Sequence, residues 1–145
     1  MMQEPWSVFP AVLDRYDDML DYVLERAREC GVPDKRLLRM QLGFEEAVVN
    51  VISYAYDKAA PGKVWLRAGQ QGDRFMLEMA DKGRPFNPLL KSDALQRAGE
   101  GTLEEQKIGG LGISFMRRVF DDMSYHYESE EQPVGNRLLL EMTLE

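Results

Sequence analysis

Apolar and polar residues alternate with a helical period in the first part of the chain. Residues 12–30 place apolar side chains on one stripe with charges opposite, and Gly31 and Pro33 follow as helix breakers. Residues 34–57 begin with Asp34, a residue type that favours helix caps, and keep the same period. The apolar stripe of this second segment consists of Leu37, Met40, Phe44, Val48, Val51 and Ala55. The pattern predicts two amphipathic helices.

The middle of the chain changes to the period of strands. Residues 6–11, before the first helix, are long enough for a short strand. After a Pro-Gly turn at residues 61–62, the segments 63–69 and 73–81 have the length and composition of strands, and only two glutamines and a glycine separate them. We therefore expect an antiparallel hairpin.

The last third of the chain combines a polar segment, a glycine-rich turn, a helix and two strands. Residues 89–107 are polar and weakly periodic, which is typical of a lid or a disordered loop. The turn 108–112 precedes a predicted helix over 113–122, and residues 123–129 and 136–144 alternate like strands. This order predicts an α+β fold, a two-layer sandwich in which helices cover one face of a mixed, mostly antiparallel sheet.

Composition narrows the classes of protein that fit this pattern. The 145 residues suit a single domain, 1–145, and the formal net charge of −7 disfavours general binding of nucleic acid. One cysteine, Cys30, and one histidine, His126, exclude an internal disulfide and a zinc cage, so a metal would be held by oxygen atoms. No signal peptide is visible, and no apolar run reaches the ~18 residues of a membrane span. We expect a cytoplasmic protein that does not enter a membrane.

Two polar residues on the second predicted helix are candidates for chemistry. Glu46 and Asn50 are four residues apart, so they project together on the side away from the apolar stripe. One carboxylate and one amide then share a small patch. The alternative is that this patch is only the solvated face of an amphipathic helix.

The second candidate is the end of the strand 73–81. Alternation places Asp81 on the same side as Phe75, Leu77 and Met79, at the rim of an apolar layer. A carboxylate there needs hydrogen-bond donors, and the exocyclic amine of a purine is a suitable one. Gly83 would let the backbone pass close beneath a flat ring. The alternative is that Asp81 simply caps a tight turn.

The third candidate is the glycine turn that precedes the last predicted helix. Gly109, Gly110, Leu111 and Gly112 leave backbone N–H groups at a positive helix end, which favours an anion such as a polyphosphate. The turn lacks the Gly-Lys-Ser/Thr of a P-loop. The alternative is a flexible helix start whose glycines serve packing.

Together, these motifs resemble the Bergerat-fold ATPases, the superfamily of gyrase, Hsp90, histidine kinase and MutL nucleotide domains. More narrowly, the chain is similar to the bacterial anti-sigma factor serine/threonine kinases. The resemblance extends from the second helix to the carboxyl end. Its stretches are "FEEAVVNVISYAY", "DKGRPFNP", "GGLGISFMRRVFDDMSY" and "GNRLLLEM".

The resemblance implies a role for each candidate residue. Asn50 would hold the Mg²⁺ that bridges the ATP phosphates, because Mg²⁺ prefers hard oxygen ligands. Glu46 would be the general base for the hydroxyl that attacks the γ-phosphate, or the residue that orients this hydroxyl. Asp81 would bind the adenine amine, with Gly83 under the ring.

The phosphates would be bound from the other side of the nucleotide. The resemblance implies that the turn 109–112 offers backbone N–H groups to them, above all from Gly110 and Gly112. Lys107 and Arg84 are basic residues that would assist, although neither belongs to a motif.

The chain departs from the family pattern at two positions. Tyr54 stands where family members often have a histidine, so the role of that histidine is absent or altered. Pro85 replaces a second glycine of the superfamily, and Pro85 followed by Phe86 is common in the anti-sigma branch.

The resemblance implies an ATP-dependent kinase that binds a sigma factor and phosphorylates a serine of a STAS-type anti-sigma antagonist, with dimerisation as a family expectation. The catalytic domain of a histidine kinase is disfavoured, because 145 residues leave no room for a dimerisation helix pair with a phosphoacceptor histidine. A non-catalytic nucleotide-binding module that acts by sequestering a partner remains the alternative.

Overall fold

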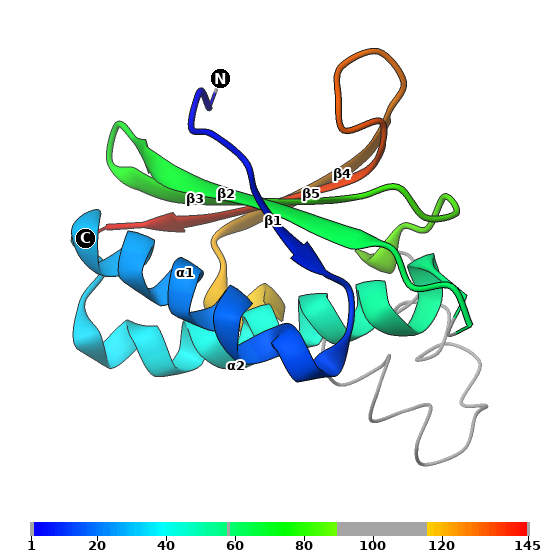
Figure 1. Ribbon diagram of the computed structural model, residues 1–145. Coiled ribbons are helices and arrows are strands. Elements are labelled where there is room, and N and C mark those ends of the chain that lie inside the picture. Colours follow the sequence, from blue (N-terminus) through cyan, green and yellow to red (C-terminus); the bar gives the residue numbers. More distant parts are fainter. Residues whose placement is uncertain (1, 58, 90–115, 145) are drawn as a thin grey trace, which may run out of the picture.

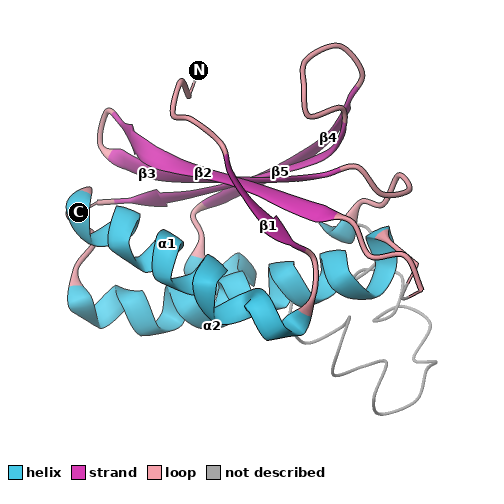
Figure 2. Ribbon diagram, in the orientation of Figure 1, coloured by secondary structure: helices cyan, strands magenta, loops and turns pink. Residues whose placement is uncertain are grey.

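A layer of helices lies against a five-stranded sheet (Figure 1). The computed structural model describes residues 2–57, 59–89 and 116–144. Figure 2 shows both long helices on one face of the sheet. The α+β sandwich expected from the sequence is confirmed.

The strands are β1 (Ser7–Pro10), β2 (Lys63–Gln71), β3 (Arg74–Asp81), β4 (Asp122–Glu128) and β5 (Gly135–Thr143). They lie in the order β1-β2-β3-β5-β4. Every pairing between these strands is antiparallel, so the described sheet is antiparallel throughout where a mixed sheet was expected. In the register of β3 and β5, Asp81 lies opposite Asn136.

The first long helix, α1 (Tyr16–Glu29), follows a short 3-10 turn, η1 (Leu13–Arg15). It ends where the glycine signal predicts. Gly31 has a φ of 93°, and the N–H of Val32 donates to the carbonyl of Ala27 at 3.0 Å. This is a Schellman cap, for which glycine in the left-handed region is the usual residue.

The second helix has two parts. α2 (Asp34–Asn50) is α-helical and continues into a π-helical turn, η2 (Val51–Ala55). The sequence predicts one uninterrupted helix over 34–57, because a period of 3.6 does not reveal a local change to the wider π turn. Such turns occur often at functional sites, and this one begins directly after Asn50.

The last predicted helix ends earlier than expected. Residues 116–119 are helical, whereas the sequence predicts a helix over 113–122 whose first three residues lie outside the described part. The N–H of Asp121 already donates to the carbonyl of Glu141 in β5 at 2.8 Å, and β4 begins at Asp122. Pairing with the sheet therefore ends the helix.

The core lies between the helices and the sheet. Met40, Phe44 and Val48 of α2 are fully buried, as the apolar stripe predicts. The strands contribute alternate residues to the same core. These are Val64, Leu66, Ala68, Phe75, Leu77, Met79, Leu138, Leu140 and Met142.

A charged cluster packs on the opposite face of the sheet. Glu78 pairs with Arg67 at 2.6 Å and with Arg137 at 3.4 Å, and both guanidinium groups lie over the Trp6 ring, at 4.1 and 5.0 Å from its centroid. Arg137 also donates to the carbonyl of Pro133 at 3.1 Å. The cluster holds the beginning of β5 in place, next to Asn136.

Candidate functional site

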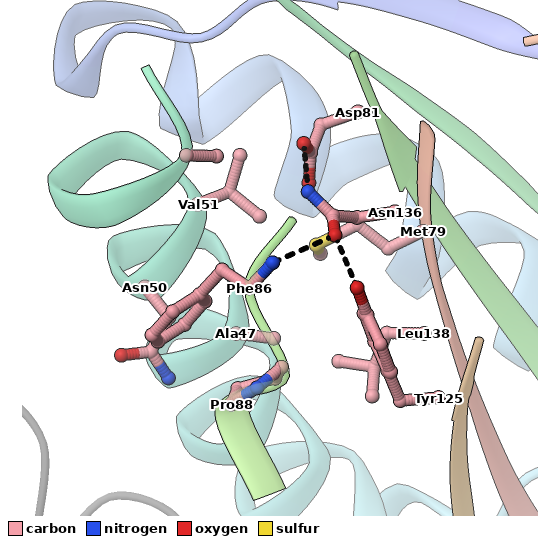
Figure 3. Close-up of a pocket in the computed structure, with 11 residues that line it drawn as sticks. Ala47, Asn50, Val51, Met79, Asp81, Phe86, Pro88, Tyr125, Asn136 and Leu138 are labelled. Carbon is pink, nitrogen blue, oxygen red and sulfur yellow. Dashed lines mark hydrogen bonds between the residues drawn. The ribbon is translucent and has the colours of Figure 1, made fainter. Parts of the chain in front are cut away.

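A small cavity of about 20 Å³, partly open to solvent, lies where the end of α2 meets the ends of the central strands (Figure 3). α2 and η2 form one wall, and β3, β4 and β5 form the other. The segment that follows β3 lines a further side through Phe86 and Pro88. The lining residues are Ala47, Asn50, Val51, Ala55, Met79, Asp81, Phe86, Pro88, Tyr125, Asn136 and Leu138.

Asp81 is the only acidic residue among the described residues of this lining, and it is 4% exposed. Its Oδ1 accepts hydrogen bonds from the N–H of Gly83 at 2.9 Å and from Nδ2 of Asn136 at 2.8 Å. Burial raises the pKa of the Asp81 carboxyl, and these two hydrogen bonds offset part of the rise. Among the described residues, none donates a hydrogen bond to Oδ2, which leaves one oxygen for a ligand.

The bond from Gly83 shows that Asp81 also caps a turn. This was the alternative to a ligand-binding role, which stays a prediction and would use the other oxygen of the carboxylate. Asp81 lines the cavity beside Met79, on the helix-facing side of β3 that alternation predicts.

Asn136 organises the sheet side of the cavity. Its Nδ2 donates to Asp81 and to the carbonyl of Arg84, at 2.8 Å each. Its Oδ1 accepts from the N–H of Phe86 at 3.0 Å and from the hydroxyl of Tyr125. The dashed lines in Figure 3 converge on this side chain. Sequence reasoning did not select Asn136, and the available signal was a polar amide shortly before the apolar run Leu138–Leu140.

Asn50 lies on the α2 side of the cavity, across from Asp81 and Asn136 (Figure 3). It is 2% exposed, so the solvated-face interpretation is wrong for this residue. Both polar atoms of its side-chain amide are buried, and neither has a hydrogen-bond partner among the described residues. Burying such an amide costs about 1–3 kcal/mol, and a ligand that contacts its oxygen would recover that energy. An amide oxygen is a hard ligand of the kind that Mg²⁺ prefers.

Glu46 lies one helical turn before Asn50 and is half-buried. It is not among the residues that line the cavity. The structure therefore brings Asn50 and Asp81 together and places Glu46 beside the cavity. Among the described residues, no three His, Cys, Asp or Glu side chains gather in a possible metal cage.

Gly83 is explained by a backbone contact. A Cβ at this position would collide with the carbonyl of Ala55 and lie 2.7 Å from the Ala55 Cβ. The next residue, Arg84, donates its N–H to that same carbonyl at 3.0 Å. Gly83 therefore lets the segment after β3 pack on the end of η2, and its position beneath a ring stays a prediction.

Tyr54 stacks on Phe86 with a centroid distance of 5.2 Å and an interplanar angle of 24°. Phe86 lines the cavity, so this aromatic pair connects η2 with the cavity wall. The side chain at position 54 thus supports the segment that follows β3.

The residues expected to bind the phosphates lie outside the part of the chain that the structure describes. Lys107, Gly109, Gly110, Leu111 and Gly112 lie outside the described residues.

None of the described helices is both long and apolar enough to cross a membrane.

Three curated relatives are kinases by name. Serine-protein kinase RsbW of Bacillus licheniformis is 29% identical over 91 residues, which cover 62% of this chain and 57% of that protein. Serine/threonine-protein kinase BtrW of Bordetella bronchiseptica is 28% identical over 81 residues, or 56% of this chain and 55% of that protein. RsbW of Listeria innocua is 21% identical over 121 residues, which cover 82% of this chain and 76% of that protein. The chain spans little more than half the length of the first two relatives.

A solved structure and a family model agree on the fold. The catalytic domain of histidine kinase ThkA superimposes with a TM-score of 0.51 at 17% identity, covering 96% of this chain and 95% of that one. The model of the histidine kinase-like ATPase domain matches residues 9–142. With this match along nearly its whole length, the chain belongs to the histidine kinase-like ATPase domain family, as its Bergerat-type motifs indicate.

Proposed function

We propose that residues 1–145 act as a single ATPase domain that binds ATP with Mg²⁺ and phosphorylates a serine or threonine of a partner protein, as an anti-sigma factor kinase does. One observation carries this proposal. The buried amide of Asn50 has no hydrogen-bond partner within the described part of the chain, and it lines the same cavity as the Asp81 carboxylate, of which only Oδ1 is hydrogen-bonded there. The kinase names of the relatives support the same reaction class.

The adenine base is assigned to the sheet side of the cavity. Oδ2 of Asp81 is an acceptor for the exocyclic amine, while Oδ1 stays occupied by Gly83 and Asn136. Met79 and Leu138 line the same cavity and supply apolar surface for the faces of the ring.

The triphosphate and its Mg²⁺ are assigned to the α2 side. The oxygen of the Asn50 amide is the ligand that this chain offers to the metal, and it is already buried and desolvated. Mg²⁺, when bound, neutralises charge on the phosphates. The turn 109–112 and Lys107 are proposed to contact the phosphates from outside the described part.

The transfer step is proposed to use Glu46 as the general base. The oxygen of the acceptor hydroxyl forms a bond to the γ-phosphorus as the bond from that phosphorus to the bridging oxygen breaks, which releases ADP. The hydroxyl proton passes to the Glu46 carboxylate. Because Glu46 lies beside the cavity, this role places the acceptor at the cavity's edge, where a protein segment can approach.

The proposed partners are a sigma factor and a STAS-type antagonist protein that supplies the acceptor serine. The net charge of −7 suits a basic patch on a partner. Assembly as a homodimer and residence in the cytoplasm belong to the same proposal, and the family resemblance supports both.

A second candidate function is a nucleotide-binding module that sequesters a partner without turnover. The position of Glu46 outside the cavity lining favours it. Under this alternative, ATP binds at Asn50 and Asp81 as above, and no phosphate is transferred.

Calorimetry and phosphate transfer separate the two candidates. We would titrate ATP with and without Mg²⁺ into the wild type, Glu46→Gln and Asn50→Ala, and follow transfer from γ-labelled ATP to a STAS protein of the source organism. Glu45→Gln is the matched control, because Glu45 is the exposed neighbour of Glu46.

We expect Glu46→Gln to bind ATP normally and to lose about 10²–10⁴-fold in transfer rate, the usual contribution of a general base. Asn50→Ala should lose the part of the affinity that depends on Mg²⁺. Normal transfer by Glu46→Gln would refute the role of Glu46, binding without transfer by the wild type would favour the second candidate, and absence of ATP binding would overturn both.

A further inference from the structure

A second cavity, of about 220 Å³ and open to solvent, lies at the far end of α2. It is bounded by the first turns of α2, residues 118–121 and the end of β5. Figure 1 shows the beginning of α2 and the end of the chain at the same end of the molecule. Its lining residues are Arg36, Arg39, Arg118, Val119, Asp121, Met142 and Thr143.

This cavity is distinct from the candidate nucleotide site. Arg36 and Asn50 stand on one helix, and a rise of about 1.5 Å per residue separates them by about 21 Å. The two cavities also lie at opposite ends of β5, because Asn136 lines the first cavity and Thr143 lines the second.

Among the described residues, three arginines and one aspartate line this cavity, which is called the arginine cavity below. The carboxylate of Asp121 accepts the N–H of Thr143 at 2.7 Å, and Arg36 donates to the carbonyl of Thr143 at 2.6 Å. Within residues 2–57, 59–89 and 116–144, the exposed side chains of Arg39 and Arg118 form no hydrogen bond or ion pair.

The arrangement concentrates positive charge in a chain whose net charge is −7. Arg36 and Arg39 come from α2 and Arg118 from the segment before β4, so the fold itself brings the third cation to the other two. Guanidinium groups bind carboxylate and phosphate through parallel N–H donors, and neighbouring cations repel each other until an anion joins them.

We propose that Arg36, Arg39 and Arg118 form a binding site for one oxyanionic group, a phosphate or a carboxylate. Arg36, fixed by its bond to the end of β5, supplies the preset part of the site, and Arg39 and Arg118 close on the anion from either side. The group comes either from a small phosphorylated solute or from an acidic side chain of a protein, and the site does not depend on the proposed kinase activity.

Nuclear magnetic resonance tests this site directly. The intact protein, labelled with ¹⁵N, would be titrated with inorganic phosphate and, separately, with a short peptide rich in aspartate. The readouts are the Nε–H signals of the arginines and the backbone amides of Met142 and Thr143. Arg39→Gln and Arg118→Gln are the test variants, and Arg28→Gln, an exposed arginine of α1, is the matched control.

We expect saturable shifts at the arginine cavity with at least one of the two probes. Either test variant should weaken binding at least about tenfold, as expected from the loss of a charge-assisted hydrogen bond, and Arg28→Gln should leave it unchanged. Binding of phosphate would assign the site to a small solute, and binding of the peptide alone would assign it to a protein side chain. No saturable shift with either probe, or equal weakening by Arg28→Gln, would overturn the proposal.

Discussion

Replacing Asp81 by asparagine changes one atom of the side chain that is proposed to select the adenine base. Two donors, the N–H of Gly83 and Nδ2 of Asn136, hold Oδ1 in place at 2.9 and 2.8 Å. In Asp81→Asn the amide oxygen should keep both bonds. The amide NH₂ then takes the place of Oδ2, so a donor faces the purine amine where an acceptor stood.

The magnitude follows from the kind of bond that is lost. A hydrogen bond to a charged group contributes about 1.5–3 kcal/mol, and the variant also leaves two donors opposed. We therefore expect ATP affinity to fall about 30- to 150-fold, which corresponds to about 2–3 kcal/mol.

The same substitution lowers ATP affinity but should raise the free energy of unfolding relative to the wild type as the pH rises. Burial raises the pKa of the Asp81 carboxyl, so the folded protein holds this proton more tightly than the unfolded chain. The stability that this group contributes is fully present below its ordinary pKa and declines as the pH rises through the raised value. Asp81→Asn does not titrate, so its free energy of unfolding should gain on the wild type from about pH 4 upward.

Two assays check these expectations. Calorimetry measures ATP affinity, and urea unfolding at a series of pH values measures the free energy of unfolding. Asp73→Asn, at the exposed hairpin turn, is the control for the change in net charge. Wild-type affinity in Asp81→Asn, or a stability difference from the wild type that does not vary with pH, would refute this reasoning.

Other substitutions test single contacts, each by urea unfolding in the absence of ligand. Asn50→Leu should stabilise the protein by about 1–3 kcal/mol, because it removes a buried amide without partners; a loss of stability would contradict this. Gly83→Ala should destabilise it by about 2–4 kcal/mol through the collision with Ala55, and an unchanged stability would show that the segment yields. Tyr56→Phe should cost about 1–2 kcal/mol, because the hydroxyl donates to the carbonyl of Lys63 and accepts the N–H of residue 82, both at 2.7 Å; a smaller cost would mean that water replaces both bonds.

The periodic elements could be predicted because their signals are local. Gly31 ends α1 through its own backbone conformation, and alternation along β3 places Asp81 on the buried side. The predicted helix over 113–122 extended too far, because the pairing of Asp121 with β5 is a contact between segments distant in the sequence.

The site could be predicted only in part, because several of its contacts join segments that are distant in the sequence. Asn136 binds Asp81 because the register of β3 and β5 sets them opposite each other, and no local pattern encodes that register. The contact between Gly83 and Ala55 likewise depends on how two distant segments meet. A helical projection places Glu46 near Asn50, but one turn of about 5.4 Å along the axis is enough to leave the cavity.

The central claim is that Asn50 and Asp81 bind the two ends of one nucleotide. It is tested most directly by NMR with ATP and a trace of Mn²⁺, a paramagnetic ion that takes the same oxygen ligands as Mg²⁺. The account predicts that the side-chain amide signal of Asn50 broadens beyond detection only when ATP is present, while the signal of Asn136 shifts and stays visible. Broadening centred elsewhere, with the Asn50 signal unaffected by Mn²⁺ and ATP together, would contradict it.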